Sequence, residues 1–356
     1  MSVTTLFLLT VGLIILVFGA ELLVRGASAL AVSVGISPLV VGLTVVAFGT
    51  SSPELAVSVL AAWKGQAGIA LGNVVGSNIC NVLLILGLSA VVAPLVVARQ
   101  VVRLEVPIMI GTSLLLILFA LDGAIAHWEG ALLFAGVIGY TFWTIRRSRR
   151  ELREQAEPAA AETPQVSSRS RQLVEIVGGL ILLGIGSKLL VDGAVTIAHY
   201  LGVSDLIIGL TIIAVGTSLP ELATSVLASW RGQRDIAVGN VVGSNIFNIL
   251  AVLGLSTLVA PGGLTVPPAA LTLDLPVMLA VAVACLPVFM AGHRINRWEG
   301  LLFLGYYGVY VLFLVLTAID HDSRMLLGQA MLWFALPLTV LTLAISLWRH
   351  RPASRL

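Results

Sequence analysis

Two polar segments interrupt long apolar stretches of the sequence, and each contains a glutamate directly after a proline. The first reads GTSSPE at residues 49–54, and the second reads GTSLPE at residues 216–221. An ionised carboxylate at the centre of a bilayer costs at least ~2.5–3.5 kcal/mol, so Glu54 and Glu221 each need a partner. No lysine or arginine lies at comparable depth in these stretches. The simplest partner is therefore a bound cation, or a proton on the carboxyl group.

The residues around each glutamate can supply further oxygen ligands. Thr50 and Glu54 are spaced i, i+4, which puts them on one helix face with Ser51 alongside. Pro53 has no N–H, and its ring clashes with the carbonyl four residues earlier. The helix should therefore kink or unwind over Ala47–Gly49 and direct backbone oxygens inward. The second segment repeats this arrangement with Thr217, Ser218, Pro220, Glu221 and Ala214.

The following apolar stretch of each half adds a serine and an asparagine four residues apart. The candidate ligands are the side chains of Glu54, Glu221, Thr50, Thr217, Ser51, Ser218, Ser77, Ser244, Asn81 and Asn248, and the carbonyls of Ala47 and Ala214. Such a shell of hard oxygens suits Na⁺ and Ca²⁺ rather than zinc or copper. A cluster that holds either Ca²⁺ or Na⁺, but not both at once, is the physical basis of antiport.

Each candidate ligand also has a purely structural interpretation. The two glutamates could be protonated carboxyl groups that hydrogen-bond between helices. The serine and threonine hydroxyls could bond to carbonyls four residues earlier in their own helices. Asn81 and Asn248 could join helices by hydrogen bonds without touching an ion.

The composition is that of a polytopic membrane protein. Of the 356 residues, 58% are hydrophobic and only 11% are charged, and the mean hydropathy is +1.04. A soluble domain is roughly 25% charged, and a membrane-spanning helix needs about 20 apolar residues. Runs of that length occur at 4–24, 37–62, 68–93, 102–121, 128–146, 173–198, 204–229, 235–259, 269–291, 298–318 and 325–348.

The first ten runs form two copies of a five-helix unit. Residues 49–89 match residues 216–256 at 30 of 41 positions. An odd number of spans per unit places the copies in opposite orientations, which predicts an inverted-topology repeat. The predicted fold is thus all-α, with 10 transmembrane helices in two inverted repeats and an eleventh, C-terminal helix. The predicted units are the first repeat at 1–147, a cytoplasmic linker at 148–172, the second repeat at 173–319 and the extra helix at 325–348.

The basic residues predict the orientation of the chain. With the N-terminus outside, 17 lysines and arginines lie in cytoplasmic segments, whereas only Lys64 and Arg324 lie outside. The sequence therefore predicts a multi-pass protein of the cell membrane (plasma or inner), with a cytoplasmic C-terminus and the lipid bilayer as its surroundings. The net charge of +2 is too small to suggest nucleic acid as a partner. The sequence does not indicate an oligomeric state.

The sequence predicts neither an enzyme nor a resident cofactor. Cys80 and Cys285 both lie in apolar runs, so no disulfide framework or CxxC metal site is available. GxSxG and HExxH motifs are absent, and the five histidines fall in or beside loops. Ca²⁺ and Na⁺ would then be transported substrates, not cofactors.

The paired motifs resemble the two α-repeats of prokaryotic sodium/calcium exchangers in the cation/Ca²⁺ antiporter superfamily. The resemblance covers residues 1–318 and rests on GTSSPE with GNVVGSNICN, and on GTSLPE with GNVVGSNIFN. It implies an ion-binding core of helices two, three, seven and eight, across which helices one and six slide. The resemblance also implies ligand roles. Glu54 and Glu221 would be the main Ca²⁺ ligands, with Thr50 and Thr217 at the same central site. The flanking Na⁺ sites would be formed by Ser51, Ser77, Ser218, Ser244 and the carbonyls of Ala47 and Ala214, and an inner subsite by Asn81 and Asn248.

One position departs from this resemblance, because relatives often carry an aspartate where this chain has Asn248. An amide keeps one acceptor oxygen but removes a titratable group, so potassium dependence is not expected. The sequence predicts a secondary transporter that exchanges Ca²⁺ for Na⁺ by alternating access. The alternative is an H⁺-coupled antiporter of Ca²⁺ or another divalent cation. A cation channel is disfavoured, because a passive conductance would not require two inverted halves.

Overall fold

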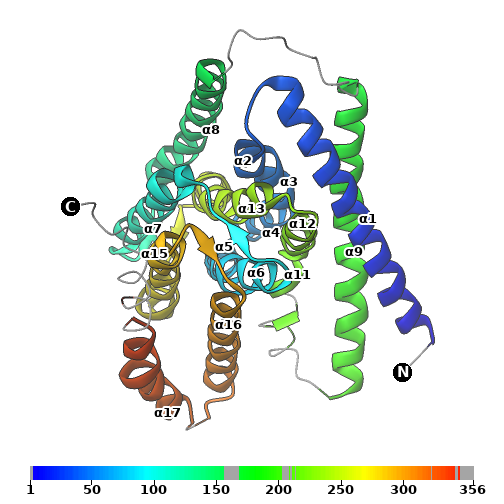
Figure 1. Cartoon of the computed structure of the whole chain (residues 1–356). Coiled ribbons are helices and arrows are strands. Elements are labelled where there is room, and N and C mark those ends of the chain that lie inside the picture. The colour runs from blue at the N-terminus through cyan, green and yellow to red at the C-terminus, as the bar shows by residue number, and fades with distance from the viewer. Residues whose placement is uncertain are drawn as a thin grey trace.

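The computed structural model describes residues 3–155, 168–202, 208, 211–212, 214–321, 323–340 and 344. These residues form mainly helices, which pack side by side in a bundle with a separate pair, α1 and α9, along one flank (Figure 1). Wide π-helical turns, labelled η, interrupt several of the helices.

The elements of the first half are α1 Val3–Val34, α2 Pro38–Val41, η1 Gly42–Val46, α3 Ala47–Thr50, α4 Ser52–Trp63, α5 Ala67–Cys80, η2 Asn81–Leu86, α6 Gly87–Val92, β1 Leu95–Val96, η3 Val101–Glu105, α7 Val106–Ala120, β2 Ala124–Ile125 and α8 His127–Gln155. Those of the second half are α9 Arg169–Tyr200, α11 Ala214–Gly216, α12 Leu219–Trp230, α13 Arg234–Phe247, η5 Asn248–Leu253, α14 Gly254–Val259, β3 Leu264–Thr265, η6 Ala270–Asp274, α15 Leu275–Met290, β4 Arg294–Ile295, α16 Arg297–Ala318, α17 Ser323–Ala330 and η7 Met331–Ala335.

The helices confirm that the protein has several membrane-spanning segments. Within the described residues, seven helices are long and apolar enough to cross a bilayer, or eight if the bent pair Pro38–Thr50 and Ser52–Trp63 is one span. The predicted run 128–146 lies in α8, which is not among these helices, and the predicted runs 204–229 and 325–348 lie partly outside the described residues. The predicted total of ten or eleven spans therefore stays a prediction.

Helices extend into both ends of the predicted linker 148–172. Helix α8 continues to Gln155 and α9 begins at Arg169, while residues 156–167 lie outside the described part of the chain. Ion pairs between residues four apart support these helical ends, as Arg147–Glu151 and Arg171–Glu175 show.

Glycines bring α1 and α9 into close contact along their length. They recur every seven residues, at positions 12, 19 and 26 of α1 and at positions 179, 186 and 193 of α9. A Cβ atom at Gly19 would lie 2.8 Å from the Leu183 backbone nitrogen, and one at Gly179 would lie 2.7 Å from the Leu23 backbone nitrogen. The lack of side chains on this stripe allows the two backbones to touch.

The two segments that contain the GNVVGSN motif lie at the centre of the bundle. Most of the span Ala67–Val92 is buried, and the apolar window of the span Arg234–Val259 is buried completely. Helix α13 packs directly on η1, where a Cβ atom at Gly243 would lie 2.6 Å from the Leu43 carbonyl oxygen. The motif is therefore in the interior, where its polar side chains need protein or ion partners.

Two short antiparallel strand pairs join loops of the first half to loops of the second. Strand β1 pairs with β4, with Leu95 opposite Ile295, and β2 pairs with β3, with Ile125 opposite Leu264. Each pair connects the end of a central segment to the loop between two helices of the other half. The pairs thus fix the outer helices to the core at both ends of the bundle.

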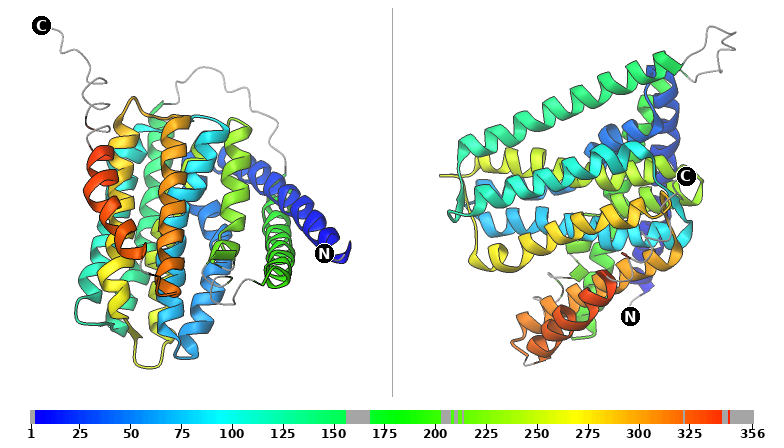
Figure 2. Two further views of the ribbon diagram at one scale, coloured as in Figure 1. Left: turned by 90° about the horizontal axis from the view of Figure 1, so that it is seen from below. Right: turned by 60° about the vertical axis from the view of Figure 1, so that its left-hand side comes forward.

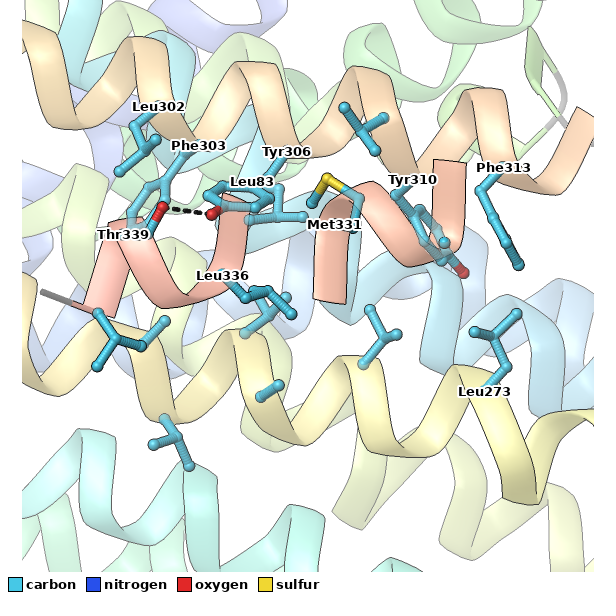
Figure 3. Close-up of a pocket in the computed structure, with 18 of the residues that line it drawn as sticks. Leu83, Leu273, Leu302, Phe303, Tyr306, Tyr310, Phe313, Met331, Leu336 and Thr339 are labelled. Atoms are coloured by element: carbon cyan, nitrogen blue, oxygen red, sulfur yellow. Dashed lines mark hydrogen bonds between the residues drawn. The ribbon is translucent and has the colours of Figure 1, made fainter. Parts of the chain in front are cut away.

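The C-terminal segment leaves an apolar groove on the periphery. Helices α16 and α17 lie at the edge of the bundle beside α15 (Figure 2). The groove between them has a volume of about 700 Å³ and is lined by apolar and aromatic side chains such as Leu273, Phe303 and Met331 (Figure 3). None of the described lining residues is charged, so the groove is separate from the predicted ligand cluster.

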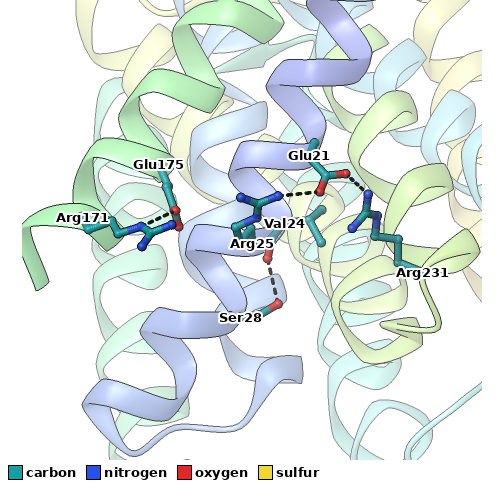
Figure 4. Close-up of polar contacts among 7 residues, drawn as sticks. All are labelled: Glu21, Val24, Arg25, Ser28, Arg171, Glu175 and Arg231. Carbon is teal, nitrogen blue, oxygen red and sulfur yellow. Dashed lines mark hydrogen bonds and ion pairs between the residues drawn. The ribbon is translucent and has the colours of Figure 1, made fainter. Parts of the chain in front are cut away.

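Polar contacts tie α1 to the loop between α12 and α13 (Figure 4). The Glu21 carboxylate pairs with Arg25 at 3.1 Å and also with Arg231, at the start of that loop. The Ser28 hydroxyl donates to Oε1 of Gln233 at 2.6 Å. Helix α1 of the first half is thus held to the second half by charge as well as by apolar packing.

The glycine contacts generate a paired prediction. Gly179→Ala should lower the thermal unfolding temperature in detergent, because its Cβ would overlap the α1 backbone at a cost of about 1–3 kcal/mol. Gly178→Ala is the matched control, since a Cβ there meets no described atom within 4 Å and alanine favours a helix by up to about 1 kcal/mol. Equal unfolding temperatures for the two variants would contradict the close α1–α9 contact.

Candidate functional site

The predicted ligands lie where helices are interrupted. The helix Pro38–Trp63 bends by 47° at Ser51, which separates α3 from α4. In the second half, Thr217 and Ser218 separate α11 from α12. Glu54 and Glu221 consequently lie in the first turn of a new helix, where the helix dipole favours negative charge.

The interruption is not where the sequence analysis placed it. Residues Ala47–Thr50 are helical rather than unwound, and the Ala47 carbonyl accepts the Ser51 N–H at 3.0 Å. The reason is that Pro53 belongs to the first turn of α4, where a missing N–H leaves no bond unmade. The Ala47 carbonyl retains a second lone pair. In the second half the backbone of Ala214 begins α11, and its side chain lies outside the described structure.

Each buried glutamate is held by a serine from the other half of the chain. Glu54 and Glu221 are both 0% exposed. The Ser218 hydroxyl donates to Oε1 of Glu54 at 2.9 Å, and the Ser51 hydroxyl donates to Oε1 of Glu221 at 2.9 Å. Each half of the chain therefore supplies a hydrogen-bond donor to the carboxylate of the other half.

The two threonines likewise contact asparagines of the opposite half. Thr50 Oγ1 donates to Oδ1 of Asn240 at 3.1 Å, and Thr217 Oγ1 contacts Oδ1 of Asn73 at 3.5 Å. Thr50 also lies 3.0 Å from the Val46 carbonyl, so the back-bonding alternative is confirmed for this residue. The Ser51 and Ser218 hydroxyls instead reach across to the glutamates.

Asn73 and Asn240 brace the helices that carry the glutamates. The amide nitrogen of Asn73 donates to the Glu54 carbonyl at 3.3 Å and to Ser58 Oγ at 2.9 Å. Asn240 makes the equivalent bonds to the Glu221 carbonyl at 3.4 Å and to Ser225 Oγ at 2.9 Å.

Asn81 and Asn248 begin the wide turns η2 and η5 and bond across the two halves. The amide nitrogen of Asn81 donates to Oδ1 of Asn245 at 3.0 Å, and that of Asn248 donates to Oδ1 of Asn78 at 3.0 Å. The structural interpretation of these residues as links between helices is confirmed for their nitrogens. Their oxygens remain available.

Four acceptor oxygens in this cluster have no hydrogen-bond partner among the residues that the structure describes. They are Oε2 of Glu54, Oε2 of Glu221, Oδ1 of Asn81 and Oδ1 of Asn248, and all four are buried. A buried acceptor without a donor costs roughly 1–3 kcal/mol. These atoms can bind a cation, whereas the amide nitrogens of Asn81 and Asn248 and the hydroxyls of Ser51 and Ser218 already donate to protein acceptors.

The two further predicted serines differ from each other. Ser77 accepts the Ser218 hydroxyl at 3.3 Å, so it lies at the Glu54 carboxylate. Ser244 is fully buried and its hydroxyl has no described partner.

Sequence reasoning missed six residues of this network, namely Asn73, Asn78, Asn240, Asn245, Ser58 and Ser225. A signal was present, because all six are identical between the two copies at an offset of 167. The four asparagines lie within the GNVVGSN motif, from which only the serine was chosen; the predicted ligands Asn81 and Asn248 lie three residues after that motif.

A pocket of about 330 Å³ lies beside the two interruptions. It is lined by Gly49, Pro53 and Pro220 from the interrupted helices and by Leu180 and Gly184 from α9. The carboxylates themselves are fully buried, so this pocket does not expose them.

Comparisons with known proteins place the chain among ion exchangers. A family model described as "Sodium/calcium exchanger protein" matches residues 4–146 and 172–316. The inner membrane protein YrbG of Escherichia coli is 38% identical over 309 residues, which are 85% of this chain and 94% of that protein. The sodium/calcium exchanger MaX1 of Methanosarcina acetivorans is 33% identical over 349 residues, which are 88% of this chain and 99% of that protein. A solved structure of the sodium-calcium exchanger NCX_Mj superposes with a TM-score of 0.75 at 32% identity, covering 88% of this chain and 99% of that one.

The serine–glutamate exchange generates a second paired prediction. Ser51→Ala removes the 2.9 Å hydrogen bond to the Glu221 carboxylate oxygen Oε1 and should destabilise the ion-free protein by roughly 1–3 kcal/mol. Ser52→Ala is the control, because Ser52 is exposed and its described side-chain hydrogen bond goes to the nearby Phe48 carbonyl of α3, in the same half. Denaturant or thermal unfolding in detergent measures both variants, and an equal loss at the two positions would contradict the cross-half contact.

Proposed function

The chain belongs to the sodium/calcium exchanger protein family, and on this premise we propose that it exports Ca²⁺ in exchange for Na⁺ by alternating access. Family membership supports a cation/Ca²⁺ antiporter. The observation that carries the proposal is the set of four buried acceptor oxygens without donors, two of them on carboxylates. No lysine or arginine pairs with either carboxylate among the described ion pairs.

The proposed ligand roles follow from charge and position. Glu54 and Glu221 are the main Ca²⁺ ligands, because two carboxylates balance one divalent cation. Thr50 and Thr217 contribute to the same central site. The flanking Na⁺ ligands are Ser51, Ser77, Ser218, Ser244 and the carbonyls of Ala47 and Ala214. Asn81 and Asn248 line an inner subsite with their unpartnered oxygens.

Competition for these oxygens makes the exchange obligatory. The carboxylates are fully buried, so a site without any cation would leave two charges uncompensated at membrane depth. Ca²⁺ and Na⁺ each relieve this cost, but they use the same oxygens and cannot bind together. The ion site can therefore switch between access from one side of the membrane and access from the other at a low free-energy cost only when Ca²⁺ or Na⁺ is bound.

We assign this chemistry to a fold of ten transmembrane helices in two inverted repeats, with an eleventh helix at the C-terminus. The reciprocal hydrogen bonds between equivalent residues support a two-fold relation of the halves. We place the protein in the cell membrane, with its N-terminus outside the cell and its C-terminus in the cytoplasm.

H⁺ coupling is the second candidate function, because the same carboxylates can exchange protons for Ca²⁺. The neutral amides at positions 81 and 248 favour Na⁺, since each offers an oxygen that cannot carry a proton.

The central mutational prediction concerns the two carboxylates. Glu54→Gln or Glu221→Gln should lower Na⁺-gradient-driven ⁴⁵Ca²⁺ uptake into proteoliposomes by at least about tenfold, the effect of ~1.4 kcal/mol. Glu105→Gln is the matched control. Glu105 is equally buried, but its oxygens accept hydrogen bonds from Gln100 and Tyr140, so its variant should retain most of the uptake. Full uptake by the Glu54 and Glu221 variants would overturn the proposal.

The same proteoliposomes test which ion is exchanged for Ca²⁺. A Na⁺ gradient should drive ⁴⁵Ca²⁺ uptake at constant pH, whereas a pH gradient in Na⁺-free buffer should drive little. The reverse result would establish H⁺ coupling instead. Calcium flux that needs no opposing ion would indicate a channel, because a channel has no obligatory exchange.

A further inference from the structure

The amide of Asn78 is oriented by a backbone carbonyl of the other half. Its nitrogen donates to the carbonyl oxygen of Asn245 at 3.2 Å. A carbonyl oxygen can only accept a hydrogen bond, so Asn78 must turn its NH₂ group toward it. Oδ1 of Asn78 must then point in the other direction.

That oxygen in turn fixes the amide of Asn248. Oδ1 of Asn78 accepts from Nδ2 of Asn248 at 3.0 Å. The NH₂ group of Asn248 is therefore committed to Asn78, and its own Oδ1 is left buried without a donor. Rotating the Asn248 amide by half a turn would set two oxygens against each other and direct an NH₂ group at the ion site.

The equivalent chain of contacts on the other side is weaker. Nδ2 of Asn81 donates to Oδ1 of Asn245 at 3.0 Å, which leaves Oδ1 of Asn81 without a donor. The NH₂ group of Asn245, however, is held by the sulfur of Met109 at 3.3 Å. A thioether is a weak acceptor, so Asn245 is oriented less firmly than Asn78.

We propose that Asn78 is a positioning residue for cation binding. Asn78 donates to the Asn245 carbonyl and accepts from the NH₂ group of Asn248. These two contacts orient the Asn248 amide so that its oxygen, and not its NH₂ group, faces the bound cation. Asn245 does the same, less firmly, for Asn81. This inference rests on the proposed function, in which Asn248 is a ligand.

The experiment measures equilibrium binding of ²²Na⁺ and ⁴⁵Ca²⁺ to the purified full-length protein in detergent, which requires no transport. Asn78→Leu should weaken Na⁺ binding roughly three- to tenfold, the effect of one lost hydrogen bond. Ca²⁺ binding should change less than about twofold, because the two carboxylates hold that ion. Asn78→Ala serves as a second variant that removes the same contact without adding bulk. The corresponding Asn245→Leu change should weaken Na⁺ binding less than Asn78→Leu does.

A double-mutant cycle separates positioning from a merely structural role. In an Asn248→Ala background, Asn78→Leu should have no further effect on Na⁺ binding, because the oxygen it positions is gone. Additive losses in that background, or equal weakening of Na⁺ and Ca²⁺ binding, would overturn the inference.

A wild-type protein that binds neither ion would overturn both this inference and the proposed function. If the wild type binds both ions but a Na⁺ gradient drives no Ca²⁺ uptake, the proposed exchange fails, and the binding data still decide the role of Asn78.

Discussion

Two carboxylates buried without a basic partner set the main constraint on this structure. Glu54 and Glu221 are both completely enclosed, and one oxygen of each accepts a hydrogen bond from a serine of the opposite half. The other oxygen of each has no hydrogen-bond partner among the described residues. An arginine or lysine at this depth would neutralise them permanently and leave no reason to bind an ion. Hydroxyl and amide neighbours orient the carboxylates without cancelling their charge. The site is therefore polar enough to be stable and still incomplete without a cation.

The interrupted helices are the means by which this constraint is met. A continuous helix would use all its backbone groups internally and would present Glu54 in the middle of a span. The break at Ser51 instead makes Glu54 part of a helix N-terminus, and Ser218 does the same for Glu221. The wide turns that begin at Asn81 and Asn248 interrupt the two central segments beside the site. Wide turns of this kind occur often at functional sites, because they disturb the regular helix at small cost.

Much of this site could be predicted from the sequence, because duplication marks it. The repeated GTS-x-PE segments identified the glutamates, and the spacing of the hydroxyl residues predicted their neighbours. The position of the interruption could not be deduced, because Pro53 is compatible both with an unwound preceding turn and with the first turn of a new helix. The contacts of Asn78 and Asn245 could not be deduced either. They cross between segments 167 residues apart in the sequence, and helix periodicity within one segment carries no information on such pairs. The number of spans stayed open because two predicted runs lie partly outside the described residues, and a third, 128–146, lies in the helix α8, which is less apolar than the counted spans.

The reciprocal hydrogen bonds also determine when, during synthesis, the site can form. The hydroxyl that donates to Glu54 belongs to Ser218, which is synthesised 164 residues later. At a rate of about 5–20 residues per second, the growing chain holds that carboxylate without its serine for on the order of ten seconds or more. The first half must therefore enter the membrane while Glu54 still lacks the donor that Ser218 supplies. Assembly of the second half against it is then more than the addition of further helices, because it supplies the donor that the first half lacks. A chain that stops before residue 218 would leave the Glu54 carboxylate without this partner.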